Sequence, residues 1–177
     1  LSCPYTTAKA RVILQEMAES LSLDLVRKNY LTNHLTLSIN YDASSSTNKR
    51  DKIVADHYGR RVPKPLQGTI RLKYQTNSTK LITKGFLDFY DQHINPNFTI
   101  RKITVCANEL LDIVDSEIIH DSSASAALQT NLFTNYADLE RQRNIELNSL
   151  RKENRIQKAI LKIRDRYGKN AILRGIN

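Results

Sequence analysis

Residue types that often perform catalysis are present in this 177-residue chain, but their spacing matches no catalytic or metal-binding motif. Two-metal phosphoryl transfer needs clustered carboxylates, whereas the acids here are spread over a basic loop, a helix flank and an irregular stretch: Asp51, Asp56, Asp88, Asp91, Asp112, Asp115 and Glu117. The four histidines are dispersed, and the chain has no Walker, Gly-x-Ser-x-Gly or Gly-x-Gly-x-x-Gly sequence. We therefore predict no catalytic residue, metal ion or cofactor in this chain.

Basic side chains are the most abundant candidates for binding chemistry. The chain has 27 Lys and Arg against 18 Asp and Glu, a net charge of +9. Residues 1–110 carry 16 basic and 9 acidic side chains, and residues 111–177 carry 11 and 9. Eight of the basic residues lie between Lys49 and Lys73. This excess favours nucleic acid as the partner, ahead of an anionic membrane.

The chain ends and the cysteines indicate where the protein works. No apolar run approaches the roughly 18 residues that a membrane span needs, and the first residues lack the pattern of a signal peptide. Two cysteines, Cys3 and Cys106, are too few for a disulfide framework or a zinc site. We expect a soluble, cytoplasmic protein with no membrane partner. Because the chain does not begin with Met, we also expect it to be a fragment of a longer protein.

Hydrophobic periodicity predicts the elements that position the basic side chains. Helical spacing of apolar residues predicts two helices, over 7–28 and 78–93. Residues 29–33 form a polar break after the first helix. Alternation of apolar and polar residues then predicts strands over 35–41 and 99–107. Between them, residues 57–73 are predicted to be extended chain that prolines interrupt. Each helix has one apolar face and each strand one polar face. The economical arrangement is an α+β fold, an antiparallel sheet with two helices packed on one face.

The remainder of the chain differs in composition. The small polar residues of 120–131 are typical of a linker. A long helix is predicted over 136–167, with loosely spaced apolar residues, and Gly168 ends it. We expect a domain over 1–110, a linker over 111–135 and a helical tail over 136–177.

Several short segments, in order, resemble one protein family. They are Tyr5-Thr6, Leu35-Thr36-Leu37-Ser38-Ile39, Tyr58-Gly59-Arg60-Arg61, Thr76-Asn77-Ser78-Thr79 and Ile100-Arg101-Lys102-Ile103-Thr104-Val105. Together they resemble the little-finger domain of Y-family lesion-bypass DNA polymerases, most of all the bacterial branch related to UmuC and DinB (the ImpB/MucB/SamB family). Residues 163–173 resemble the C-terminal end of the same bacterial group.

The resemblance implies a non-catalytic part of a DNA-directed DNA polymerase that acts in error-prone translesion synthesis, SOS mutagenesis and DNA repair. The little finger of this family grips primer-template DNA through its sheet, beside the other polymerase domains. The palm that binds Mg²⁺ would lie N-terminal to Leu1, so no metal is implied in this chain. The family domain normally begins with a strand, and at most the end of that strand can lie near Leu1.

The polar face of the predicted sheet supplies the candidate DNA contacts. Lys and Arg side chains would neutralise phosphates, and hydroxyls and amides would donate hydrogen bonds to phosphate oxygens. These contacts position a duplex without reading its sequence. The DNA-binding residues that we predict are Arg60, Arg61, Arg71, Lys73, Arg101 and Lys102, with Thr36, Ser38, Asn40 and Thr104 as neutral contacts.

A second motif lies in the linker. Gln129-Thr130-Asn131-Leu132-Phe133 resembles the Gln-x-x-Leu-Phe peptide with which bacterial polymerases bind the sliding clamp. Leu132 and Phe133 would fill an apolar pocket on the clamp, and the Gln129 amide would hydrogen-bond at its rim. The alternative is an ordinary linker whose Leu and Phe pack on their own domain.

Two other classes of function remain open from the sequence. One is a free-standing nucleic-acid-binding module, which aromatic side chains on the sheet face would favour through base stacking. The other is a helical interaction domain that uses the 136–167 helix, including homo-association through it. The apolar spacing of that helix breaks a strict heptad.

Overall fold

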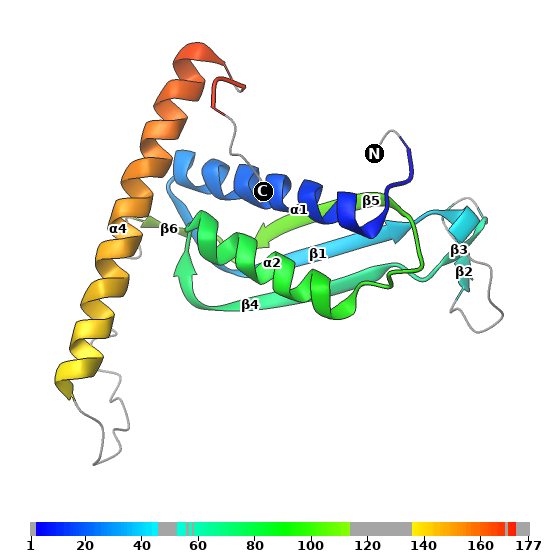
Figure 1. Cartoon of the computed structure of the whole chain (residues 1–177), viewed down its shortest axis with the longest axis horizontal. Helices are drawn as coiled ribbons and strands as arrows, with labels where there is room; N and C mark the ends of the chain where they lie inside the picture. The colour runs from blue at the N-terminus through cyan, green and yellow to red at the C-terminus, as the bar shows by residue number, and fades with distance from the viewer. Residues whose placement is uncertain are drawn as a thin grey trace.

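The computed structural model describes residues 3–45, 53–55, 57, 59–113, 136–168 and 170–172; within the last helix, side chains are described at 141, 145 and from 148 onward. The elements follow in the order α1 (Thr7–Arg27), β1 (Tyr30–Tyr41), the 3-10 turn η1 (Ala43–Ser45), β2 (Ile53–Ala55), β3 (Arg61–Pro63), β4 (Leu66–Thr76), α2 (Thr79–His93), β5 (Ile100–Asn108), β6 (Leu111–Asp112) and α4 (Tyr136–Tyr167). Figure 1 shows α1 and α2 side by side on one face of the sheet. The α+β fold predicted from the sequence is confirmed.

The main sheet is antiparallel, with β1 in its centre. Its strand order is β4-β1-β5, and β6 also pairs with β1. The β6 residue Leu111 pairs with Leu31 in the same register in which Asn108 of β5 pairs with His34. β5 and β6 therefore extend along the same side of β1. A separate hairpin of β2 and β3 lies near the opposite end of the sheet (Figure 1).

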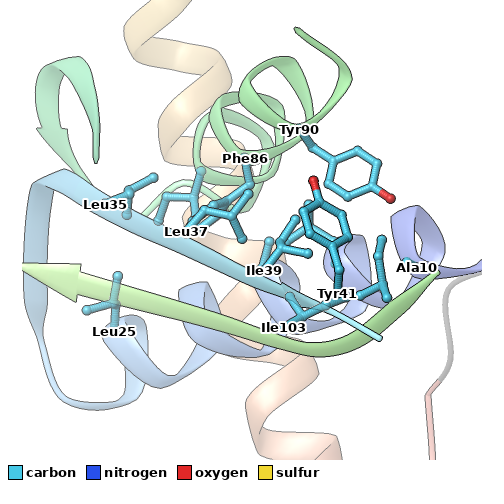
Figure 2. Close-up of a cluster of buried hydrophobic side chains, with 13 residues drawn as sticks. Ala10, Leu25, Leu35, Leu37, Ile39, Tyr41, Phe86, Tyr90 and Ile103 are labelled. Carbon is cyan, nitrogen blue, oxygen red and sulfur yellow. The ribbon is translucent and has the colours of Figure 1, made fainter. Parts of the chain in front are cut away.

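The core lies between the sheet and the two helices. From β1, Leu35, Leu37 and Ile39 have no exposed surface, and they face α2 residues such as Phe86 (Figure 2). The intervening β1 residues are more exposed, so strict alternation separates a core face from a polar face. On β4, Ile70 and Leu72 pack against the core while Arg71 and Lys73 are exposed, as alternation predicts.

Local capping explains where the helices begin. The Thr6 and Ser78 hydroxyls accept hydrogen bonds from the backbone N–H groups of Lys9 and Leu81, which satisfies a free donor at the start of α1 and α2. After α1 the chain turns at Asn29, whose φ of 57° is left-handed. The polar break is shorter than the 29–33 expected from the sequence, because β1 already begins at Tyr30.

The start of the described chain pairs with the outer edge of β5. Tyr5 and Ile100 exchange two backbone hydrogen bonds, of 2.9 and 2.8 Å between N and O. This pair is an isolated antiparallel bridge. It places the residues before α1 beside β5.

α4 packs across the end of the helical layer (Figure 1). The Gln157 side chain is 1% exposed, and its Nε2 donates to the Asn77 carbonyl at 3.0 Å and to Thr79 Oγ1 at 2.7 Å. Leu161 packs with Leu23 and Val26 of α1. The C-terminal helix predicted from the sequence is therefore docked on the domain by both polar and apolar contacts.

Candidate nucleic-acid interface

The candidate interface is the face of the sheet opposite α1 and α2, which we call the polar face. Three cross-strand rows of polar side chains define it: Arg71–His34–Asn108, Thr69–Thr36–Cys106 and Gln67–Ser38–Thr104, with the pair Asn40–Lys102 beyond them. The structure thus brings Thr36, Ser38, Asn40, Arg71, Lys102 and Thr104 together on one surface, on β1, β4 and β5.

The centre of the polar face is neutral and hydrogen-bonded. Asn108 Nδ2 donates to Thr36 Oγ1 at 2.8 Å, and Gln67 Nε2 donates to Ser38 Oγ at 3.3 Å. These bonds fix the amide side chains across neighbouring strands. The hydroxyls keep further hydrogen-bonding capacity, because each combines a donor with two acceptor lone pairs. Gln67 and Asn108 are not among the contacts predicted from the sequence.

The end of the polar face near β6 combines a cation, a histidine and an acid. Glu109 Oε1 lies 2.9 Å from His34 Nδ1 and 3.4 Å from an Arg71 guanidinium nitrogen. Glu109 has a left-handed φ of 48° at the junction between β5 and β6. Glu109 is not among the residues predicted from the sequence, because strand alternation gives no signal for a position between two strands. Glu109 lies within reach of both His34 and Arg71 and offsets part of the Arg71 charge.

The opposite end of the polar face contains a pair of exposed cations. Tyr41 pairs with Ile100 and Asn40 with Lys102, so Arg101 is the extra residue of a β-bulge. The bulge leaves both Arg101 and Lys102 exposed between the buried Ile100 and Ile103. Strict alternation would turn one of the two cations toward the core, and the bulge explains how both reach solvent.

Asp42 marks the place where the β2–β3 hairpin approaches this end. Its pKa lies below the ordinary value, first because the Ser44 hydroxyl donates a hydrogen bond to it and further because the positive charges of Arg101 and Arg60 lie nearby. Arg60, which the sequence predicts to bind DNA, and Arg101 therefore both lie near the Asp42 carboxylate. Arg61 is exposed at the start of β3 and belongs to the hairpin rather than to the main sheet.

Lys73 lies at an irregularity of β4. Between the pairs Thr32–Thr76 and His34–Arg71 the register shifts, and three β4 residues within the shift, Lys73, Tyr74 and Gln75, are exposed in a row. Tyr74 is 53% exposed, with the Lys73 ammonium 5.0 Å from the centre of its ring. Continued alternation would turn Tyr74 inward, so alternation does not predict its exposure. Modules that stack bases carry two or three aromatics on central strands, whereas Tyr74 is a single aromatic on the outer strand β4.

This arrangement suits the binding of a polyanion. Within the described ranges, no three His, Cys, Asp or Glu side chains come together as a metal-binding group. Among the same residues, no helix is long and apolar enough to cross a lipid bilayer. Exposed cations at both ends of a hydroxyl- and amide-rich surface can bind phosphates along a nucleic-acid backbone. The predicted clamp-binding residues Gln129, Leu132 and Phe133 lie outside the described residues.

A comparison with known families gives the class of protein. Residues 3–132 match the impB/mucB/samB family C-terminal domain. The match covers more than half of the chain, so the chain belongs to this family, the C-terminal domain of UmuC/DinB-type DNA polymerases. The resemblance stated from the sequence motifs is thereby confirmed. A comparison with curated proteins found no match.

Proposed function

We propose that this chain is the DNA-gripping and clamp-binding part of an error-prone lesion-bypass polymerase, without catalytic residues of its own. The observation that carries the proposal is the polar face. Its rows of hydroxyls and amides run over three strands, and cations lie at both ends, from Arg71 to Lys102. Membership of a DNA polymerase family makes primer-template DNA the partner that this surface best fits.

The chemistry explains why such a surface suits lesion bypass. Guanidinium and ammonium groups displace the counterions of DNA phosphates, which gives affinity for any sequence. Neutral donors such as Thr36 and Ser38 add directional hydrogen bonds to phosphate oxygens. Because none of these contacts requires an undamaged base, the grip tolerates a distorted template.

Charge reversal on the polar face tests this proposal. The Arg71→Glu/Lys102→Glu variant should bind a fluorescent primer-template duplex more weakly whatever its sequence. The slope of log affinity against log salt should also fall by about two, because two phosphate contacts are lost. Fluorescence anisotropy over a salt series measures both quantities. The proposal would be refuted by a flat salt response of the unaltered chain.

A matched control separates a surface contact from a general change of charge. Lys9→Glu/Lys84→Glu alters the net charge equally, and both residues are exposed on the helical layer. This control should keep nearly the original salt slope. Equal losses in both variants would mean that the polar face has no special role.

The clamp-binding part of the proposal concerns Gln129, Leu132 and Phe133. The Leu132→Ala/Phe133→Ala variant should lose capture by a purified bacterial sliding clamp, because both apolar anchors are removed. Surface plasmon resonance against immobilised clamp measures the loss. Thr130→Ala is the neighbouring control and should retain binding. Unchanged capture by the double variant would contradict this part while leaving the DNA proposal standing.

A further inference from the structure

The charge of the C-terminal part is divided unevenly between two segments. Residues 111–140 contain six acidic and no basic side chains, whereas residues 141–177 contain 11 basic and 3 acidic ones. The small net charge of residues 111–177 therefore conceals a strongly basic segment. Most of that segment is α4, which lies after the residues that match the family.

Both acids in the described second half of α4 face the domain. The Glu153 carboxylate accepts from Ser78 Oγ at 2.6 Å and from the Lys80 backbone N–H at 2.9 Å, at the start of α2. Asp165 accepts from an Arg27 guanidinium nitrogen at 3.0 Å. These acids are thus engaged with α1 and α2, and they leave the outer surface of α4 to its cations.

Five cations share that outer surface, which we call the α4 basic stripe: Arg151, Arg155, Lys158, Lys162 and Arg166. All five are exposed. Because each residue of an α-helix is turned about 100° from the one before, the five cations lie within an arc of about 80° around the helix axis. The centre of this arc is about 140° away from the side that docks on the domain, which carries Glu153, Gln157 and Leu161. From Arg151 to Arg166 the stripe extends about 22 Å along the helix axis.

The stripe works against the stability of its own helix. Successive members are three or four residues apart, and like charges at these spacings destabilise a helix by about 0.2–0.5 kcal/mol per pair. In the part of the chain that the structure describes, none of the five cations forms an ion pair with an acid. Bound phosphates would remove this repulsion, and phosphates spaced along a nucleic-acid strand match a linear array of cations.

We propose that the α4 basic stripe is a second DNA-binding surface, which binds the phosphate backbone of a DNA segment other than the one on the polar face. α4 docks on the helical layer, and the polar face lies on the opposite side of the sheet, so the stripe and the polar face belong to different sides of the molecule. A membrane surface is the alternative ligand, because a membrane-bound helix inserts apolar side chains beside its basic ones, and Ile156 and Ile163 of α4 are exposed. Membership of a DNA polymerase family favours DNA.

The inference rests on the proposed function for its ligand, DNA, but it concerns different residues. The test compares three double variants of the intact chain on one fluorescent random-sequence duplex that carries single-stranded extensions. They are Arg155→Glu/Lys162→Glu on the stripe, Arg71→Glu/Lys102→Glu on the polar face and the control Lys9→Glu/Lys84→Glu. Circular dichroism checks that each variant keeps its helix content.

The stripe variant should weaken binding at about 0.1 M salt at least tenfold more than the control does, and it should lower the salt slope by about two. A neutral variant, Arg155→Gln/Lys162→Gln, should lose affinity to a smaller extent.

If the stripe variant matches the control while the polar-face variant loses binding, the stripe proposal is overturned and the proposed function stands. If neither differs from the control, both are overturned. Loss of binding to phosphatidylserine vesicles with unchanged DNA binding would assign the stripe to membranes and overturn the inference.

Discussion

At the scale of single residues, Gly68 shows how closely β4 and α2 approach. A Cβ atom at position 68 would clash with the Phe89 ring, and that ring is itself stacked on His93 at a centroid distance of 4.3 Å. Any side chain at position 68 must therefore displace the ring. This explains the glycine on the core side of a strand, where it otherwise costs stability.

The Gly68→Ala variant should be destabilised by about 1–3 kcal/mol, the usual cost of overpacking. Urea unfolding followed by circular dichroism gives the free energy of unfolding. The neighbouring Thr69→Ala change removes an exposed side chain from the other face of the same strand and should cost less than about 1 kcal/mol. An unfolding midpoint for Gly68→Ala equal to that of the unaltered chain would contradict the packing argument.

Two buried tyrosines predict an alkaline loss of stability. Burial raises the pKa of Tyr90 to about 12, and the Tyr90 hydroxyl donates to the Thr7 carbonyl at 2.8 Å. Burial also raises the pKa of Tyr41 above its ordinary value. Figure 2 shows both rings at the same end of the core. The raised pKa means that the folded protein retains a proton that the unfolded chain releases.

The direction of this pH dependence follows from the coupling between proton binding and folding. An unfolded tyrosine ionises near pH 10, so the stabilisation from Tyr90 is complete below about pH 10 and is lost as pH rises through about 12. The free energy of unfolding should therefore decline over this interval, and the decline should be shallower in Tyr90→Phe. Urea titrations at a series of alkaline pH values measure it. Parallel pH profiles for the two proteins would rule the explanation out.

At the scale of elements, α4 is held by a directed chain of hydrogen bonds. Gln157 Nε2 donates to Thr79 Oγ1, which lies 2.7 Å from Ser22 Oγ. Because the Ser22 hydroxyl donates to the Glu19 carbonyl, Thr79 is the donor to Ser22. One buried amide on α4 thus organises polar groups on both α1 and α2.

Replacing this amide by an apolar group should loosen α4. Gln157→Leu leaves the Asn77 carbonyl and the Thr79 hydroxyl without their amide donor in a buried site, at a cost of about 1–3 kcal/mol. Limited proteolysis by trypsin should then cleave α4 faster, because its Lys and Arg residues become accessible to the protease. Asn148→Ala, on an exposed part of the same helix, is the control. Equal cleavage rates in both variants would show that Gln157 does not hold the helix.

The sequence predicted regular elements well and irregular ones poorly. Residues at positions such as Leu35 and Leu37 reveal their strand because alternation is a local property of the chain. The bulge at Arg101, the register shift that exposes Tyr74 and the left-handed Glu109 depend on pairing with distant strands. The docking of α4 was also hidden, because Gln157 is polar and its partners lie 78 and 80 residues away.

At the scale of the whole molecule, positively charged side chains gather on two separate surfaces. The polar face contains cations at both ends of a neutral centre, while the basic stripe of α4 belongs to the helical side. The two helices bury the apolar side of the sheet, so they leave its other side available for a ligand. The family membership and this free face together support the assignment of DNA as that ligand.

Cys106 gives the most direct test, because it is an exposed thiol in the middle of the polar face, paired with Thr36 across the strands. In a Cys3→Ser background, maleimide labelling of Cys106 is followed by mass spectrometry with and without saturating duplex DNA. The control is Val12→Cys in a chain whose native cysteines are both replaced by serine, because Val12 is 42% exposed on α1. Bound DNA should slow the labelling of Cys106 several-fold, with recovery at high salt, and should leave Val12→Cys unaffected. Labelling of Cys106 at an unchanged rate while DNA is bound would contradict the account.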